Sequence, residues 1–426
     1  MTIDTLTRAL QWAAETRGKE AGYRILDRRE EATWHPFARV AENAARIAIH
    51  KITLTNFRCY RRATLESDHR SVVLTGPNGA GKTNLLEAIS LLTPGRGLRR
   101  TKLENIVRRS RKGEVGVTGW GIAASVGTPI GPVEIGTGQE TIDDRRRKVR
   151  INAVDVSNQN ALANHISAVW LTPQMDRLFL EGASNRRRFF DRLAYGFDPA
   201  HAGRITGYNH AMRERIRLLR DGSSDDVWLL TLEKTMAERG VAIAAARREL
   251  AARVAKASMS APGQFPVAAV ASKGLLEGWL DKMPALDVEQ RFGELLKSNR
   301  RRDGELSQTS AGPHRSDFAV YHAEKGLPAD QCSTGEQKAL LIAIILADTR
   351  LQAKERNRTP LLLLDEVAAH LDEKRRCALF DEICLMGAQA WLTGTDISLF
   401  ESFRDRAQYV AVSDACLTET PNAFAA

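Results

Sequence analysis

A short glycine-rich segment, residues 76–83, constrains the fold of this chain more than any other part of its sequence. It fits the pattern G-x-x-x-x-G-K-[ST] at every fixed position, and its residues are Gly76, Pro77, Asn78, Gly79, Ala80, Gly81, Lys82 and Thr83. An apolar run precedes it at residues 71–75, and apolar residues at helical spacing follow it over residues 84–92. The pattern predicts a strand, a phosphate-binding loop and a helix, which together indicate an α/β fold.

The residue types in this segment suit a bound nucleotide. Glycines let backbone N–H groups turn towards phosphate oxygens, and the N-terminus of the following helix adds partial positive charge at the same place. We expect Lys82 to reach the β- and γ-phosphates, and the Thr83 hydroxyl to ligate Mg²⁺. The alternative is a glycine-rich turn with a chance lysine, which would not explain the match in both flanks.

The composition is that of a globular protein with room for two or three domains. The chain has 426 residues, of which 43% are hydrophobic, and no apolar run approaches the roughly 20 residues that span a bilayer. Its start lacks the apolar core of a signal peptide, and its five cysteines form no CxxC pair. We therefore expect a cytoplasmic protein without a membrane segment. The net charge of +10 favours polyanion partners, although alone it is a weak indication.

A second chemical centre lies far down the chain, where four leucines at residues 361–364 precede Asp365 and Glu366. A strand without polar residues must be buried on both faces, so we expect a central parallel strand. Its C-terminal end would then present two carboxylates at the edge of the sheet. Asp365 would hold Mg²⁺ through water, and Glu366 would orient or deprotonate the attacking water.

Two further apolar runs end in polar residues at the same kind of position. Residues 168–171 read as a buried strand that proline ends, which places Gln174 at a strand end where ligand-facing groups belong. Residues 390–394 read as another buried strand. Either Thr395 or Asp396 could face the γ-phosphate after it, and a plain loop is equally compatible with these residue types.

The rest of the chain suggests four segments. Residues 1–46 contain no recognisable chemistry and form an N-terminal extension of unknown role. Residues 47–183 begin with strand alternation and carry the glycine-rich segment, and helical periodicity dominates residues 184–302. Residues 303–426 return to strand patterns. Arginine and lysine clusters near residues 96–112 and 145–150 are either solvated faces or nucleic-acid contacts.

Several motifs resemble, in the same order, those of the ABC-type ATPases of DNA maintenance, which include the SMC proteins, and most closely those of the RecF family. Besides the glycine-rich segment they lie at residues 55–60, 170–174, 182–191, 311–317, 333–338 and 364–372. The resemblance runs from about residue 47 to the C-terminus. It implies an ABC-type ATPase head, which is a P-loop fold of the α/β class, with an inserted α-helical domain.

The same resemblance implies roles for individual residues. Residues 76–83 are similar to the Walker A loop, and Asp365 with Glu366 is similar to the Walker B pair. Gln174 resembles the Q-loop residue that links Mg²⁺ and the attacking water, which makes it both a catalytic and a metal-binding candidate.

Another group of residues resembles elements that act across a dimer. Ser333, Gly335 and Gln337 are similar to the ABC signature, which contacts the γ-phosphate bound by the opposite subunit. Residues 370–372 resemble the D-loop. ATP would therefore be sandwiched between two heads, and dimerisation would depend on ATP.

As a whole, the likeness implies a weak, DNA-stimulated ATPase of recombinational repair and replication restart. Such a protein would bind single-stranded and double-stranded DNA at gaps, form an ATP-dependent homodimer, and work with the RecO and RecR mediator proteins. Two alternatives stay open at this point, the ATPase subunit of a membrane transporter and an ATPase related to overcoming-lysogenization nucleases. The signature departs from the transporter consensus, and Thr395 and Asp396 stand where transporters have a histidine.

Overall fold

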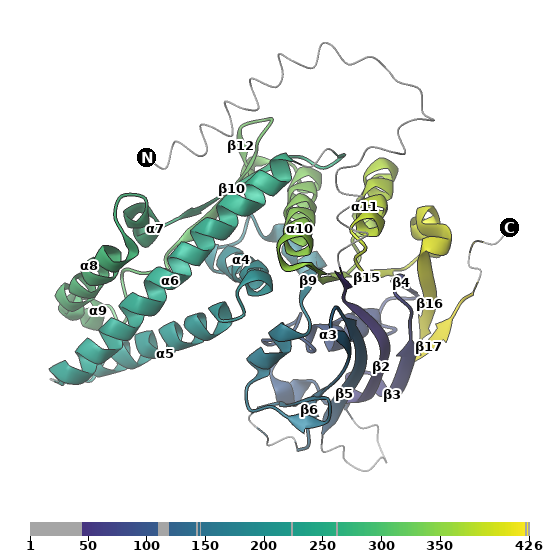
Figure 1. The fold of residues 1–426 in the computed structure, drawn as a ribbon, viewed down its shortest axis with the longest axis horizontal. Coiled ribbons are helices and arrows are strands. Elements are labelled where there is room, and N and C mark those ends of the chain that lie inside the picture. Colours follow the sequence, from purple (N-terminus) through teal and green to yellow (C-terminus); the bar gives the residue numbers. More distant parts are fainter. Residues whose placement is uncertain are drawn as a thin grey trace. The chain divides into compact units, whose positions relative to one another are not determined.

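A computed structural model describes residues 45–109, 119–141, 144, 146–222, 225–260, 263–421 and 424. These residues fall into two compact units (Figure 1). The sheet unit consists of the described residues of Leu26–Met175 and Asp348–Ala426, and the helical unit consists of Asp176–Ala347 apart from its four undescribed positions. Most of the predicted N-terminal extension, and Arg111, Lys112 and Arg145 of the basic clusters, lie outside the described residues.

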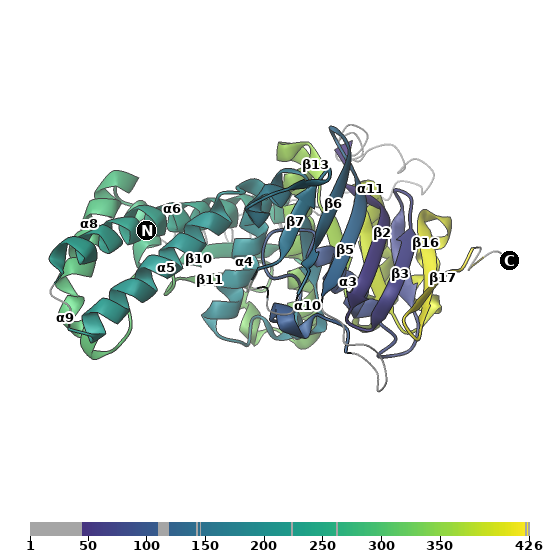
Figure 2. The same ribbon diagram turned by 90° about the horizontal axis from the view of Figure 1, so that it is seen from below.

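One sheet of the sheet unit is antiparallel, with six strands in the order β3-β2-β5-β6-β7-β8 (Figure 2). Its strands are β2 (Ala48–Phe57), β3 (Tyr60–Glu66), β5 (Trp120–Thr128), β6 (Gly131–Gln139), β7 (Lys148–Ile151) and β8 (Val154–Asp155). β2 confirms the strand that the alternation after residue 47 predicted, and the pairing of Phe57 with Tyr60 closes a hairpin between β2 and β3.

A second six-stranded sheet carries the strands that end at the predicted site. Its order is β17-β16-β4-β15-β14-β9, and every neighbouring pair is parallel except β16 and β17. The strands are β4 (Ser71–Thr75), β9 (Ala168–Leu171), β14 (Leu361–Leu364), β15 (Ala390–Gly394), β16 (Ala407–Ser413) and β17 (Cys416–Glu419). The four leucines of β14 are all buried between two parallel neighbours, which confirms the prediction of a parallel strand buried on both faces. The strand was expected to be central, but it lies next to the edge strand β9.

Helix α3 (Lys82–Ser90) shares one hydrophobic core with both sheets. Leu86 and Ile89 of this helix belong to the same buried cluster as Leu54 of the antiparallel sheet and Leu74 of the parallel sheet. The remaining elements of the unit are β1 (Ala45–Arg46), η3 (Leu103–Asn105), η4 (Gln159–Asn164), β13 (Arg358–Thr359), η7 (Ala368–His370), α11 (Glu373–Leu385) and η8 (Ile397–Arg406). The core therefore fixes α3, and with it the end of the glycine-rich loop.

The helical unit is built mainly on two long helices, α5 and α6, that lie side by side (Figure 1). Its helices are α4 (Ala183–Phe197), α5 (His201–Arg220), α6 (Asp226–Met259), α7 (Leu275–Leu280), α8 (Ala285–Ser298) and α9 (Arg300–Glu305). Two linking elements are η5 (Pro173–Arg177) and α10 (Thr334–Arg356), whose residues are divided between the two units. No helix among the described residues has both the length and the apolar character needed to cross a bilayer.

A strand interrupts the region that the helical periodicity dominates. Strand β10 (Ala268–Lys273) pairs antiparallel with β11 (Asp317–His322), and β12 (Leu327–Pro328) and η6 (Ala329–Gln331) follow. β11 lies within residues 303–426, where strand patterns were predicted, whereas β10 was not predicted. Most residues of β10 are small and apolar, so its sequence resembles the alanine-rich helix before it.

His314 of the helical unit lies in an environment that favours its neutral form. The Tyr208 hydroxyl contacts its Nδ1 atom at 2.8 Å, and its Nε2 atom lies 2.9 Å from the Thr309 carbonyl oxygen. Burial lowers the pKa of His314 to about 4, and the nearby charge of Arg315 acts in the same direction.

This depressed pKa makes a prediction for acid stability. The unfolded chain binds a proton on this histidine near pH 6.5, whereas the folded chain binds it only near pH 4. The contribution of neutral His314 to the free energy of unfolding is therefore fully present above pH 6.5 and decreases as the pH falls towards 4. The loss across this window is up to about 3 kcal/mol, at about 1.4 kcal/mol per pKa unit. Urea denaturation at pH 7 and pH 4.5 should therefore show a smaller acid loss for His314→Gln than for the unmodified chain. An equal loss, or the same effect from the exposed control His210→Gln, would contradict this.

Candidate nucleotide site

The glycine-rich segment connects β4 to α3 as predicted, and a Cβ atom would clash at two of its glycines. Gly76 has φ 147°, and a Cβ atom there would lie 2.1 Å from the Val412 carbonyl oxygen. Gly81 has φ 121°, and a Cβ atom there would lie 2.7 Å from the Tyr60 hydroxyl, which donates to the Gly81 carbonyl at 3.1 Å. A side chain at either position would displace the loop, so this backbone conformation requires glycine there.

Lys82 is the buried lysine that the motif places at the first position of α3. Its ammonium donates to the carbonyl oxygens of Gly76 at 2.5 Å and Pro77 at 2.9 Å, so the loop curls around the side chain. Burial lowers the pKa of Lys82, and the negative charges of Glu366 and Asp365 oppose that shift. The lysine is therefore held within the loop, on the same side as the two acidic residues.

Thr83 and Asp365 bring together the two motifs that lie 282 positions apart in the chain. The Thr83 hydroxyl lies 2.9 Å from Asp365 Oδ1 and 3.1 Å from Oδ2, so it can donate to either oxygen. Asp365 is buried and directly follows β14. A hydroxyl and a carboxylate at one point supply the oxygen ligands that Mg²⁺ prefers.

Glu366 stands next to this pair in an unusual backbone conformation. Its φ is 53°, a region that non-glycine residues seldom adopt, and its side chain is half-buried. Its N–H donates to the hydroxyl of Thr393 at 2.9 Å, and that hydroxyl donates to Asp365 Oδ1 at 2.7 Å. Thr393 was absent from the sequence-based prediction, because a threonine inside an apolar strand has no distinctive pattern.

Gln174 lies at the same edge of the parallel sheet. Leu171 of β9 pairs with Leu364 of β14, so the residues that follow these strands emerge side by side, and Gln174 is exposed within η5. Thr395 and Asp396 follow β15 and are both exposed. Asp396 accepts a hydrogen bond from the Ser398 N–H at 2.9 Å, so its carboxylate caps η8.

The signature-like residues belong to the helical unit, at the start of α10. Ser333 and Glu336 form a reciprocal capping box, since the Ser333 N–H donates to the carboxylate at 2.9 Å and the Glu336 N–H donates to the Ser333 hydroxyl at 3.4 Å. Hydrogen bonds from Lys325 and Ser333 lower the pKa of Glu336 to about 2. Ser333 and Gly335 are exposed, whereas Gln337 is buried and donates to the Cys332 carbonyl at 2.9 Å.

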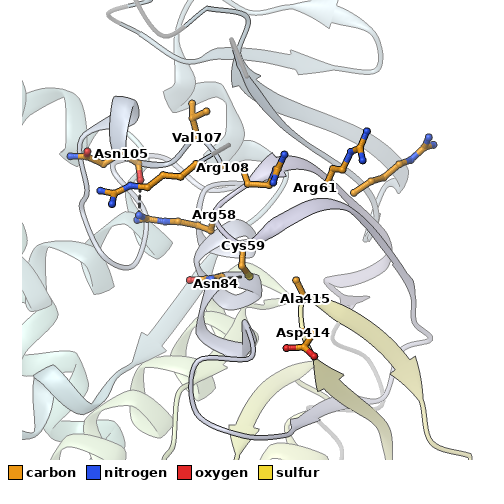
Figure 3. A pocket seen from close by; sticks show the side chains of 11 residues that line it. Arg58, Cys59, Arg61, Asn84, Asn105, Val107, Arg108, Asp414 and Ala415 are labelled. Carbon is orange, nitrogen blue, oxygen red and sulfur yellow. Dashed lines mark hydrogen bonds between the residues drawn. The ribbon is translucent and has the colours of Figure 1, made fainter. Parts of the chain in front are cut away.

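A cleft of about 920 Å³ opens beside the glycine-rich loop in the sheet unit (Figure 3). It is lined by Arg58, Cys59, Arg61, Arg62, Asn84, Asn105, Val107, Arg108, Arg109, Asp414 and Ala415. We call it the arginine cleft, because five of its residues are arginines. Arg61, Arg62 and Arg109 are exposed, and none of the three forms an ion pair with another described residue. The cleft thus presents concentrated positive charge to solvent.

The same helix that carries Lys82 and Thr83 also fixes one wall of this cleft. Glu87 of α3 is buried and receives two hydrogen bonds from Arg58, at 2.6 and 2.8 Å. Arg99 donates to Asn84 at 2.7 Å and to Glu87 at 3.3 Å. Helix α3 therefore contacts the cleft through Asn84 and Glu87 and ends the glycine-rich loop at Lys82.

Two other arginines, Arg147 of the basic clusters and Arg186 of the helical unit, stabilise the fold. Arg147 lies behind the C-terminal end of α3, where it donates to the carbonyls of Leu91, Thr93 and Gly95. Burial lowers its pKa to about 10. In the helical unit, Arg186 forms two hydrogen bonds of 2.8 Å with Asp317. These side chains satisfy buried or half-buried acceptors, which separates them from the exposed arginines of the cleft.

Comparison with known proteins defines the class first. Residues 48–413 match the family model described as "RecF/RecN/SMC N terminal domain". This match spans most of the chain, and the fold places a P-loop beside an acidic strand end. Together they confirm the predicted class, an ABC-type ATPase head of α/β type.

The relatives then narrow the class. The chain is 46% identical over 380 residues to DNA replication and repair protein RecF of Rhizobium rhizogenes, covering 88% of this chain and 99% of the relative. It is 47% identical over 382 residues to the protein of the same name from Mesorhizobium japonicum, covering 89% and 100%. The chain belongs to the RecF family of DNA replication and repair proteins. This membership favours the predicted repair function over the transporter and nuclease-related alternatives.

A solved structure supports the fold independently. The structure described as "Structure of the recombination mediator protein RecF-ATP in RecFOR pathway" superposes with a TM-score of 0.72 at 22% identity. The match covers 88% of this chain and 100% of that one.

Proposed function

We propose that this chain is an ATP-switched DNA-binding protein of recombinational repair and replication restart. The observation that carries the proposal is the contact between Thr83 and Asp365, which unites the phosphate-binding loop with the acidic strand end. The RecF family membership and the ATP named for the similar structure support the same conclusion. Hydrolysis is weak in the isolated chain and is stimulated by DNA.

The residues at the loop fit MgATP. The backbone of residues 76–83 would receive the phosphates, and Lys82 would exchange its loop carbonyls for phosphate oxygens. Thr83 and Asp365, with Gln174 from the adjacent strand end, would hold Mg²⁺, which neutralises phosphate charge when bound. No group of three or more His, Cys, Asp or Glu side chains in the described residues could hold a metal alone, so nucleotide oxygens and water would complete the shell.

Hydrolysis itself requires a base and a completed phosphate site. Glu366 is the base in this proposal, because it follows the Mg²⁺-binding Asp365 and its backbone is held beside it. Gln174 orients the attacking water. Ser333, Gly335 and Gln337 of a second copy close over the phosphates, so ATP drives homodimerisation. Gln337 is buried in the single chain, so Ser333 and Gly335 offer the more direct contacts.

The assignment of segments and partners rests on the family. We propose that residues 47–183 and 303–426 form the ATPase head and that residues 184–302 are inserted into it, with residues 1–46 as an extension of unknown role. RecO and RecR are the proposed protein partners, because the similar structure is described as part of a RecFOR pathway. The cytoplasm is the proposed compartment, where DNA and ATP are both present.

DNA binding is assigned to the arginine cleft. Its exposed arginines suit a phosphate backbone, and no zinc-finger motif or other base-reading motif occurs in the sequence. Binding would therefore be independent of base sequence, sensitive to salt and directed to gapped duplexes. Since α3 touches both the cleft and the nucleotide loop, occupancy of one site can bias the other.

The double variant Arg61→Ala with Arg62→Ala tests this assignment. Loss of two phosphate contacts should weaken binding to a gapped duplex and reduce the slope of log affinity against log salt by about 2. The measurement is fluorescence anisotropy at several salt concentrations, with ATP and with ADP. The control removes the same charge from α9 of the helical unit, as Arg301→Ala with Arg302→Ala. Equal losses in the two variants, or a flat salt response of the unmodified chain, would contradict the proposal.

A further inference from the structure

Thr393 is a buried hydroxyl at the acidic end of the parallel sheet. It lies in β15 and is completely inaccessible to solvent. Leu392 of β15 pairs with Leu364 of β14 in parallel register, so the next residues along the two strands are Thr393 and Asp365. The strand pairing therefore places this hydroxyl beside both residues of the acidic pair.

The Thr393 hydroxyl acts both as a hydrogen-bond donor and as an acceptor towards Asp365 and Glu366. Thr393 Oγ1 donates its proton to Asp365 Oδ1 at 2.7 Å, and it accepts the N–H of Glu366 at 2.9 Å. A threonine hydroxyl has one proton to donate, so donation to Asp365 leaves its lone pairs for Glu366. One atom thus connects the side chain of Asp365 with the backbone of Glu366.

These two contacts fix groups that would otherwise have alternatives. Asp365 Oδ1 also receives the Thr83 hydroxyl at 2.9 Å, and the second hydroxyl, that of Thr393, restricts rotation of the carboxylate. The φ of 53° at Glu366 is unfavourable for a residue with a Cβ atom, and the hydrogen bond to its N–H holds the chain in that conformation. Without this hydroxyl, both the carboxylate of Asp365 and the direction of the Glu366 side chain become less defined.

We infer that Thr393 is a positioning residue for ATP hydrolysis, which holds Asp365 towards Mg²⁺ and Glu366 towards the attacking water. The inference rests on the proposed function of the site. A buried threonine with a purely structural role satisfies a backbone acceptor, as Thr359 does with the Met386 carbonyl at 3.3 Å. Thr393 instead donates its only hydroxyl proton to the carboxylate of Asp365, the predicted metal ligand.

Three variants at this position and one matched control test the inference. Thr393→Val keeps the shape and removes the hydroxyl, Thr393→Ser keeps the hydroxyl, and Thr393→Cys replaces it with a weak donor of similar size. Thr359→Val removes a buried hydroxyl from the same unit. Circular dichroism checks that each variant is folded. The two readouts are the kcat of ATP hydrolysis and the affinity for ATP with Mg²⁺ and with EDTA.

We expect Thr393→Val to lower kcat about 10- to 100-fold, the usual effect of removing a hydrogen bond that orients a metal ligand. The gain in ATP affinity on adding Mg²⁺ should shrink, while the affinity in EDTA stays unchanged. Thr393→Ser and Thr359→Val should behave like the unmodified chain. If Thr393→Val does not fold, the comparison of Thr393→Cys with Thr393→Ser carries the same expectation.

The two possible failures are distinguishable. If the unmodified chain shows neither Mg²⁺-dependent ATP binding nor hydrolysis, the proposed function of the site is wrong. If the unmodified chain shows both and the variants lacking the Thr393 hydroxyl match it, the positioning role is wrong. An equal loss of activity in Thr393→Val and Thr359→Val would also overturn it, because the effect would then follow from a buried hydroxyl of any kind.

Discussion

Glu366→Gln is expected to lower the kcat of ATP hydrolysis by about a hundredfold or more, because removal of a general base costs about that much. Glutamine has nearly the same shape but cannot accept the proton of the attacking water. ATP affinity should stay close to that of the unmodified chain, because in the proposed site Glu366 would act on water, whereas the loop around Lys82 would hold the nucleotide. Phosphate release under saturating ATP and binding of a fluorescent ATP analogue measure the two effects separately.

Lys82→Ala provides the opposite control. It removes the ammonium that the loop surrounds, so it should weaken ATP binding itself. A kinetic difference between the two variants would show that binding and turnover depend on different residues of the site. If Glu366→Gln hydrolysed ATP at the normal rate, the assignment of Glu366 as the base would be wrong.

Arg215→Met is expected to lower the free energy of unfolding by about 3–5 kcal/mol, the usual cost of breaking a buried ion pair by removing one partner. Arg215 is completely buried in the helical unit. It donates to Glu233 at 3.0 Å, to Asp303 at 2.8 Å and to the Leu296 carbonyl at 2.6 Å. Arg300 also donates to Glu233, at 2.7 Å, so Asp303 is the carboxylate that would lose its charged partner in the variant. Urea denaturation followed by circular dichroism measures the loss.

The matched control for this network is Arg301→Ala. Arg301 pairs with Glu305 one helical turn away, and its side chain is almost fully exposed. Solvent screens such pairs, so the control should change stability little. Unaltered denaturation midpoints for both variants would mean that the network around Arg215 contributes no net stability.

The sequence was sufficient for the parts of the site that depend on local patterns. The glycine-rich loop, the apolar strand before it and the helix after it form one continuous signal, and β4 and α3 confirm it. Four consecutive leucines required a strand buried on both faces, which β14 is. Because parallel strands present their C-terminal ends at one edge, the meeting of Thr83 with Asp365 followed from those two assignments.

The sequence was insufficient where a role depends on tertiary contacts. Thr393 reads as an ordinary strand residue, and only its strand register with β14 brings it to Asp365. Arg147 reads as part of a basic surface cluster, yet it donates to carbonyls at the end of α3. Residue type and spacing predict neither contact, because the same residues could be exposed in a different fold.

The helical unit shows the same limit at the level of an element. β10 consists largely of alanine, valine and serine, residue types that also occur in the alanine-rich helix α6 before it. Its strand conformation comes from the ladder with β11, where Ala268 pairs with His322 and Lys273 pairs with Asp317. Pairing with a distant segment therefore overrides the local preference.

We propose that ATP closes two copies of this chain around the nucleotide and that hydrolysis releases them. The most direct measurement is size-exclusion chromatography with light scattering on Glu366→Gln, with MgATP and with MgADP. We expect a dimer with MgATP, which persists because turnover is blocked, and a monomer with MgADP. A monomer under both conditions, or a dimer of equal stability under both, would contradict it.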